Sequence, residues 1–175
     1  MSERPARYQR SFAGMIGAML VLLGVVAAFV IFRDVVRDEP ATPVRAIDYE
    51  RPAEYAKGEA SFDLVAPREL PEGWKATSVR YTPGRDEAWH IGFLTGEGRY
   101  VGLEQALELP STMVRDYVDA NAAQGDDVDI DGAAWQTWTD EGGDTALLRE
   151  QRDLVTLVVG TADQETLVEF VRLLG

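Results

Sequence analysis

The stretch SFAGMIGAMLVLLGVVAAFVIF, residues Ser11–Phe32, carries no charged side chain and decides how the rest of the chain is organised. A helical residue rises about 1.5 Å, so a helix of this length extends roughly 33 Å, enough to cross the hydrocarbon core of a bilayer. The sequence therefore predicts one N-terminal transmembrane helix over residues 11–32. A cleaved signal peptide is the alternative, because residues 26–28 resemble a small-residue cleavage site, but the length of the apolar run favours an uncleaved anchor.

Three small residues in this stretch, Gly17, Gly24 and Ala28, fall along one side of the predicted helix. Membrane helices pack where small residues let their backbones approach, because lipid supplies no hydrophobic drive for their association. The spacing therefore predicts helix packing through these residues and a weak homodimer through the span. A monomeric anchor is the alternative, because glycine and alanine are frequent in membrane helices.

The segments on either side of the span differ in composition. Residues 1–10 form a short basic tail, whereas residues 33–60 mix both charge signs with three prolines and are typical of a stalk. Lysine and arginine beside a span favour the cytoplasmic side, and the arginines of the tail are the more closely spaced. The sequence predicts a single-pass protein of the cell membrane, with a cytoplasmic tail and an extracytoplasmic domain over residues 61–175.

The residues after position 60 read as short strands separated by turn residues. Strands are expected over residues 62–65, 75–81, 88–95, 100–107, 128–130, 134–138, 145–150 and 154–159. One helix is expected between Pro110 and Gly125, and a second over residues 161–174, where apolar residues recur at helical spacing. Tight turns join most of the strands without a helical crossover. The pattern therefore predicts an α+β domain, a mostly antiparallel sheet with two packed helices.

Charge and cysteine content exclude several classes of function. The formal net charge is −13, and the tail contributes +2, so the chain beyond the span carries −15. A domain this acidic repels phosphate groups, so nucleic acid is not an expected partner. The chain contains no cysteine, which excludes disulfides, thiolate nucleophiles and cysteine-ligated zinc. No cofactor is expected.

Four separated motifs follow the tail, the span and the stalk. They are LPEGWKATSVR (70–80), WHIGFLTGEGRYVGLEQ (89–105), DGAAWQTW (131–138) and VVGTADQETLVEFV (158–171). Together they resemble the actinobacterial membrane proteins grouped as domain-of-unknown-function family 4245. The resemblance implies a single-pass membrane protein with no assigned activity, so it supplies no catalytic residue. The order of elements is also similar to the Mog1/PsbP fold, although a fold by itself does not fix function.

Aromatic residues are the first candidates for a ligand site. A groove for a sugar or a lipid is expected from Trp74, Trp89, Tyr100, Trp135 and Trp138. The alternative is that they pack in the core and across strands, as aromatic residues in strands commonly do.

Two further patterns resemble a catalytic site and a metal-binding loop, but we interpret the residues of both as structural. His90 is the only histidine, which excludes a histidine-rich metal site. A triad with Ser78 or Ser111 is arithmetically allowed, but neither serine lies in a nucleophile-elbow sequence, so His90 is expected to be a surface or half-buried structural residue. Residues 127–132, DVDIDG, match the first half of a calcium loop, but Trp138 stands where the closing glutamate belongs. A hairpin with Asp131-Gly132 as its turn is therefore expected, and no metal ligand is assigned.

These observations favour a non-enzymatic binding or scaffolding module of the cell envelope, with an envelope protein as its partner. The alternative is an enzyme or carrier that acts on an envelope glycan or lipid through an aromatic-lined cleft. A deep pocket converging on His90 or on two acids would favour the alternative.

Overall fold

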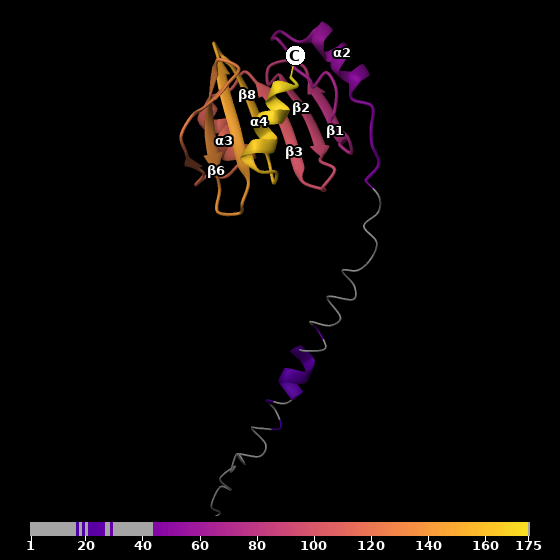
Figure 1. The fold of residues 1–175 in the computed structure, drawn as a ribbon, viewed down its shortest axis with the longest axis vertical. Coiled ribbons are helices and arrows are strands. Elements are labelled where there is room, and N and C mark those ends of the chain that lie inside the picture. The colour runs from indigo at the N-terminus through magenta and orange to yellow at the C-terminus, as the bar shows by residue number, and fades with distance from the viewer. Residues whose placement is uncertain (1–16, 18, 20, 27–28, 30–43, 175) are drawn as a thin grey trace, which may run out of the picture. The chain divides into compact units, whose positions relative to one another are not determined.

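The computed structural model describes residues 17, 19, 21–26, 29 and 44–174 (Figure 1). The chain divides into two compact units, Met1–Val44 and Arg45–Gly175. In the first unit all described residues are exposed, and all of them except Val44 are helical. No helix among the described residues is both long and apolar enough to cross a bilayer. Most of the predicted span, including Ala28, lies outside the described residues, so the span and its packing seam stay predictions.

The second unit is built on one antiparallel sheet, as the tight turns predicted. Its strands lie in the order β1-β2-β3-β8-β7-β6-β4, and β5 pairs with β6. The strands are β1 Lys75–Thr82, β2 Ala88–Leu94, β3 Tyr100–Ala106, β4 Ala123–Gln124, β5 Val128–Ile130, β6 Ala133–Thr139, β7 Thr145–Gln151 and β8 Leu154–Gly160. Every pair in the sheet is antiparallel, and the unit is an α+β domain.

The turn between β5 and β6 confirms the hairpin expected at Asp131-Gly132. Both residues adopt positive φ values, 52° and 82°, which a two-residue hairpin turn with the right twist requires. The side chain of Asp129 accepts a hydrogen bond from the Gly132 amide at 3.0 Å. Asp129 therefore serves the turn. The described residues contain no group of three or more acidic, histidine or cysteine side chains arranged to hold a metal ion.

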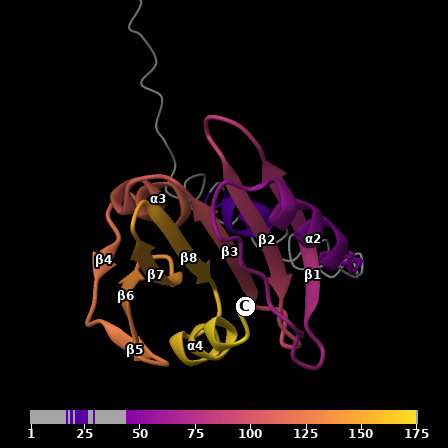
Figure 2. The ribbon, with the colours of Figure 1, turned by 90° about the horizontal axis from the view of Figure 1, so that it is seen from above.

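Helices cover both faces of the sheet. The helices are α2 Glu50–Glu59, α3 Pro110–Tyr117 and α4 Gln164–Arg172. Helices α2 and α4 contribute to one core cluster, whereas α3 contributes to a second cluster with β7 and β8. Figure 2 shows α3 and α4 on opposite sides of the strands. The alternation of side chains along β2, β3 and β8 sends one set of residues to each core.

Residues 45–60 correct the expected stalk. The sequence placed these residues outside the domain, but they include helix α2, and the compact unit begins at Arg45. Ala53 and Ala56 are buried, and the Tyr49 ring meets Phe93 edge-on at 5.7 Å between ring centroids. The domain therefore has three helices among its described residues instead of the two expected. Alanine gives only a weak apolar signal in a sequence, so the burial of Ala53 and Ala56 is visible only in the packed structure.

Helix α3 is shorter than predicted. It ends at Tyr117 rather than near Gly125, and the two-residue strand β4 occupies part of the remaining segment. Pro110 stands at the start of the helix, where its missing N–H costs no intrahelical bond. The segment after Tyr117 pairs with β6 instead of continuing the helix.

A buried glutamine ties the segment before β1 to the sheet. The amide of Gln105 donates to the Asp63 carbonyl at 3.2 Å and to the Thr156 hydroxyl at 3.1 Å. Its oxygen accepts from the Val65 amide at 2.8 Å. Because an unpaired amide in this position would cost roughly 1–3 kcal/mol, these bonds hold residues 63–65 against β3 and β8.

Candidate functional site

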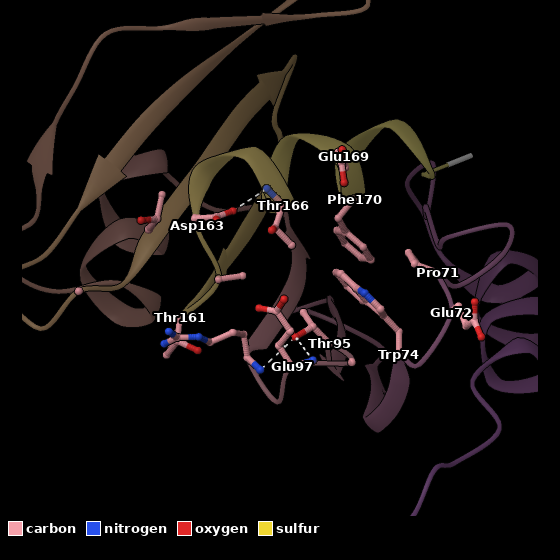
Figure 3. Close-up of a pocket in the computed structure, with 15 residues that line it drawn as sticks. Pro71, Glu72, Trp74, Thr95, Glu97, Thr161, Asp163, Thr166, Glu169 and Phe170 are labelled. Atoms are coloured by element: carbon pink, nitrogen blue, oxygen red, sulfur yellow. Dashed lines mark hydrogen bonds between the residues drawn. The ribbon is translucent and has the colours of Figure 1, made fainter.

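A pocket of about 650 Å³ lies at one end of the sheet (Figure 3). Its walls come from five segments: the turn before β1, the turn between β2 and β3, the turn between β6 and β7 with the first residue of β7, the turn between β8 and α4, and α4 itself. The residues lining it are Pro71, Glu72, Trp74, Thr95, Gly96, Glu97, Arg99, Gly143, Thr145, Thr161, Ala162, Asp163, Thr166, Glu169 and Phe170. Segments far apart in the sequence therefore meet at a single concave site.

Two stacked aromatic rings form the apolar wall of the pocket. The indole of Trp74 lies parallel to the Phe170 ring, with 5.7 Å between centroids and 7° between planes. Phe170 in turn packs on Phe93 at 5.2 Å, so the pair is fixed to the core. Trp74 is half-buried and borders the cavity, as Figure 3 shows. The stack offers a rigid, flat apolar surface of the kind on which ring-shaped ligands pack.

The position of Trp74 depends on close contact between two turns. Gly73 has a φ of +81°, and a Cβ atom there would lie 3.2 Å from the Cα atom of Gly96. Both constraints favour glycine. The turn that carries Trp74 can therefore pack directly against the turn between β2 and β3, which forms the floor of the pocket.

Threonine hydroxyls hold the polar rim in place. The Thr95 hydroxyl accepts from the amide of Arg99 at 3.0 Å, and the Thr161 hydroxyl accepts from the amide of Tyr100 at 2.9 Å. Within the part of the chain that the structure describes, neither hydroxyl hydrogen has an acceptor. Both can therefore donate to a ligand while their oxygens keep the turns fixed.

Carboxylates dominate the charge of the pocket. Four acids, Glu72, Glu97, Asp163 and Glu169, line it together with one arginine, Arg99. Asp163 caps α4 by accepting from the Thr166 amide at 2.9 Å. Hydrogen bonding to the side chain and then the amide of Thr166 lowers the pKa of the Asp163 carboxyl, and the charge of Arg99 lowers it further, so the group is ionised at neutral pH. The excess of negative charge disfavours an anionic ligand.

The five aromatic residues expected to line one groove lie in separate places. Trp74 borders the pocket just described, whereas Trp89 is fully buried and donates from its indole to the Val65 carbonyl at 3.0 Å. Trp135 is buried in the larger core and borders a different cavity, of about 240 Å³. Trp138 packs with α3 on the opposite face of the sheet, and the Tyr100 ring covers β-strand glycines outside the pocket.

The sequence did not reveal Phe170 and the threonines as parts of a site. Phe170 belongs to the apolar stripe of α4, which predicts a core residue, and it does pack in the core. Its second role as the partner of Trp74 depends on where α4 lies on the sheet. A threonine in a turn carries no distinguishing signal in the sequence.

His90 is half-buried, as expected, and it has two partners. Its Nε2 atom lies 2.8 Å from the Ser78 hydroxyl oxygen, and its Nδ1 atom lies 2.5 Å from a carboxylate oxygen of Glu104. Glu104 was not a candidate in the sequence. The three residues come from β1, β2 and β3, which the register of the sheet brings together.

Among three comparisons with known proteins, only the comparison with protein families found a match. Neither the curated proteins nor the solved structures contain a match. The resemblance to the Mog1/PsbP fold therefore stays a prediction. The model of the family described as "Protein of unknown function (DUF4245)" matches residues 7–174, and the chain belongs to that family.

Proposed function

We propose that this protein is a single-pass membrane protein whose extracytoplasmic domain binds a neutral or amino-bearing sugar of the cell envelope. The observation that carries the proposal is the Trp74–Phe170 stack in a pocket rimmed by hydroxyls and carboxylates. The C–H face of a sugar ring packs on such an aromatic surface, while its hydroxyl groups pair with side-chain oxygens. This ligand class replaces the protein partner that the sequence favoured first, because the pocket is concave and polar.

The charge of the pocket narrows the ligand class. A phosphate or carboxylate ligand would face four acids and one arginine. An uncharged sugar avoids that repulsion, and an amino group would gain from it. The apolar stretch at residues 11–32 supplies the membrane anchor in this proposal, with Gly17, Gly24 and Ala28 as the contact of a weak homodimer.

Binding of neutral and amino-bearing oligosaccharides to the full chain in detergent tests the proposal. Calorimetry should detect saturable binding, and Trp74→Ala should weaken it about tenfold, since an aromatic contact contributes about 0.5–1.5 kcal/mol. Glu169→Gln should weaken an amino-bearing ligand more than a neutral one, because it removes one negative charge from the pocket.

Trp138→Phe is the matched control, because Trp138 packs on the opposite face of the sheet. It should leave the affinity unchanged. Equal loss of affinity in both tryptophan variants, or saturation by no sugar of the panel, would contradict the proposal. If the pocket binds a protein with a basic segment and no sugar, the function would instead be the docking of a protein partner.

A further inference from the structure

Three polar side chains form a continuous chain of hydrogen bonds across β1, β2 and β3. Ser78 and Glu104 each contact one nitrogen of the His90 ring, at 2.8 Å and 2.5 Å. In the sheet, His90 is the direct cross-strand partner of Glu104. This cluster lies on the face opposite α2 and α4, separate from the pocket that contains Trp74.

The exposure of the three residues increases from the carboxylate to the serine. The Glu104 side chain is 5% exposed and that of His90 is 15% exposed, whereas Ser78 is half-buried near the free edge of the sheet. On this face α3 packs over β8, and its last residue, Tyr117, lies close enough to Glu104 for the two groups to interact. Solvent can therefore approach Ser78, whereas the Glu104 carboxylate is enclosed.

The order of the contacts determines which ring nitrogen of His90 carries the hydrogen in the neutral imidazole. A carboxylate at Nδ1 accepts the Nδ1 hydrogen, which leaves the Nε2 lone pair directed at the Ser78 hydroxyl. Burial raises the pKa of the Glu104 carboxyl, while the hydrogen bond from His90 and the charge of Arg80 lower it. The hydrogen bonds from Glu104 through His90 to Ser78 therefore run in the direction that a general base needs in order to take a proton from a serine.

We propose that Ser78, His90 and Glu104 form a nucleophile, a base and a positioning carboxylate that hydrolyse a neutral carboxylic ester. The Ser78 oxygen attacks the ester carbonyl and forms a bond to its carbon, while the hydroxyl proton passes to His90 Nε2. The ester C–O bond then breaks, and the alcohol leaves with the proton from His90. Water attacks the acyl-serine by the same route, which releases the carboxylic acid and restores Ser78.

Two groups beside Ser78 can stabilise the negative oxygen that forms during this attack. Arg80 follows two residues after Ser78 on the same face of β1, and its charge reaches Glu104 and Tyr100. The Tyr100 hydroxyl donates to no side chain in the described part of the domain. A Cβ atom at Gly92 would lie 2.4 Å from the Ser78 oxygen and 3.2 Å from the Tyr100 hydroxyl. Glycine at this position therefore lets the Ser78 and Tyr100 hydroxyl groups pack over the same point of β2.

A second serine in the domain provides a built-in comparison. The Ser61 hydroxyl donates directly to the Glu87 carboxylate, with no histidine between them. Ser61 is exposed, so reagents reach it. A hydroxyl bound to a carboxylate lacks the imidazole that would carry its proton to a leaving group. Ser61 should therefore be unreactive where Ser78 reacts.

The first experiment labels the full chain in detergent with a fluorophosphonate and measures hydrolysis of p-nitrophenyl acetate. The label should map to Ser78, and Ser78→Ala should remove it and lower turnover at least 100-fold. His90→Asn should act similarly, whereas Ser61→Ala should change neither. Glu104→Gln should reduce kcat more than it changes KM and should shift the pH profile, which a purely structural residue would not do. Turnover that survives in Ser78→Ala, or a label no stronger at Ser78 than at Ser61, would overturn the proposal.

A second experiment tests activation without a chosen substrate. Because the chain has no cysteine, Ser78→Cys and Ser61→Cys each introduce a single thiol. At about pH 6 an isolated thiol, with a pKa of about 8.5, is mostly protonated, whereas a thiol beside an imidazole forms the thiolate. Iodoacetamide should alkylate Ser78→Cys at least tenfold faster than Ser61→Cys, and adding His90→Asn should remove the difference. Equal rates would contradict activation by His90 regardless of the natural substrate.

Discussion

At the scale of single residues, two buried glutamates show how local contacts set opposite pKa directions. Glu104 is enclosed in the sheet, and burial raises the pKa of its carboxyl. Glu87 accepts hydrogen bonds from Ser61 and Tyr81, and these bonds lower the pKa of its carboxyl. The Tyr81 hydroxyl lies 2.5 Å from Glu87, which raises the pKa of Tyr81 to about 12. The difference follows from which effect is larger: hydrogen bonds outweigh the loss of solvation at Glu87, whereas burial outweighs the hydrogen bond from His90 at Glu104.

The Glu87 network predicts a specific dependence of stability on pH. The carboxyl pKa is lowered from 4.5 in the folded state, so its stabilisation is present above pH 4.5 and is lost as the pH falls through the folded value. The Tyr81 pKa is raised from 10.0 to about 12, so its stabilisation is present below pH 10.0 and is lost as the pH rises towards 12. Glu87→Gln keeps the shape of the side chain and removes the charge.

Urea unfolding at a series of pH values checks this expectation. The stability difference between wild type and Glu87→Gln should be constant at neutral pH and should shrink towards both extremes. The pKa of Tyr81, followed by ultraviolet absorbance with Tyr81→Phe as the reference, should fall towards 10.0 in the variant. A difference in stability that does not vary with pH would contradict the role of the charge.

At the scale of elements, the domain depends on how closely β3 and β8 approach each other. Gly160 ends β8 opposite Val101, and a Cβ atom there would lie only 2.0 Å from the Tyr100 carbonyl oxygen. That contact is with backbone, so no side-chain rotation can relieve it. The same end of β8 leads into Thr161 and the cap of α4, which border the Trp74 pocket. Glycine at this junction therefore positions the pocket as well as the strands.

Gly160→Ala should lower the free energy of unfolding by about 1–3 kcal/mol, as overpacking does in a closely packed region. Gly58 in α2 is the matched control, because an added Cβ atom there meets nothing within 4 Å. Gly58→Ala should raise stability by up to about 0.5–1 kcal/mol, since alanine favours the helix. Chemical denaturation of both variants measures the two changes. A neutral Gly160→Ala would show that β3 and β8 can separate without cost.

At the scale of the whole molecule, the proposed function requires the domain to lie outside the membrane that holds the anchor. The apolar stretch at residues 11–32 and the closely spaced arginines of residues 1–10 support this orientation. The acidic domain and the pocket that we propose to bind a sugar would then share the compartment of the envelope polymers. The proposal therefore depends on topology as much as on the pocket.

Alkaline phosphatase fused after Gly175 should be active, because this enzyme folds only outside the cytoplasm. The same enzyme fused before Met1 should be inactive, since the tail is expected to remain inside. Activity in intact cells, compared with the amount of fusion protein in the membrane fraction, measures the orientation. A stable but inactive C-terminal fusion would contradict the assigned topology and, with it, the envelope ligand.

Features that depend on neighbouring residues could be predicted from the amino-acid sequence. Alternation along β2 and β3, the Asp131-Gly132 turn and the apolar stripe of α4 each follow from short-range geometry, and they predicted an antiparallel α+β domain. Four motifs also identified the family, which the match over residues 7–174 confirms. These predictions succeeded because periodicity and turn chemistry are local properties.

Contacts between residues far apart in the sequence could not be predicted and became visible in the folded domain. Trp74 contacts Phe170 because α4 lies on the same face as the turn before β1, and Ser78, His90 and Glu104 meet because three strands share one register. The burial of α2 was missed because alanine carries little hydrophobic signal, although Ala53 and Ala56 fit closely against the core. Contacts of this kind depend on the register and packing of whole elements, and no local pattern in the chain specifies them.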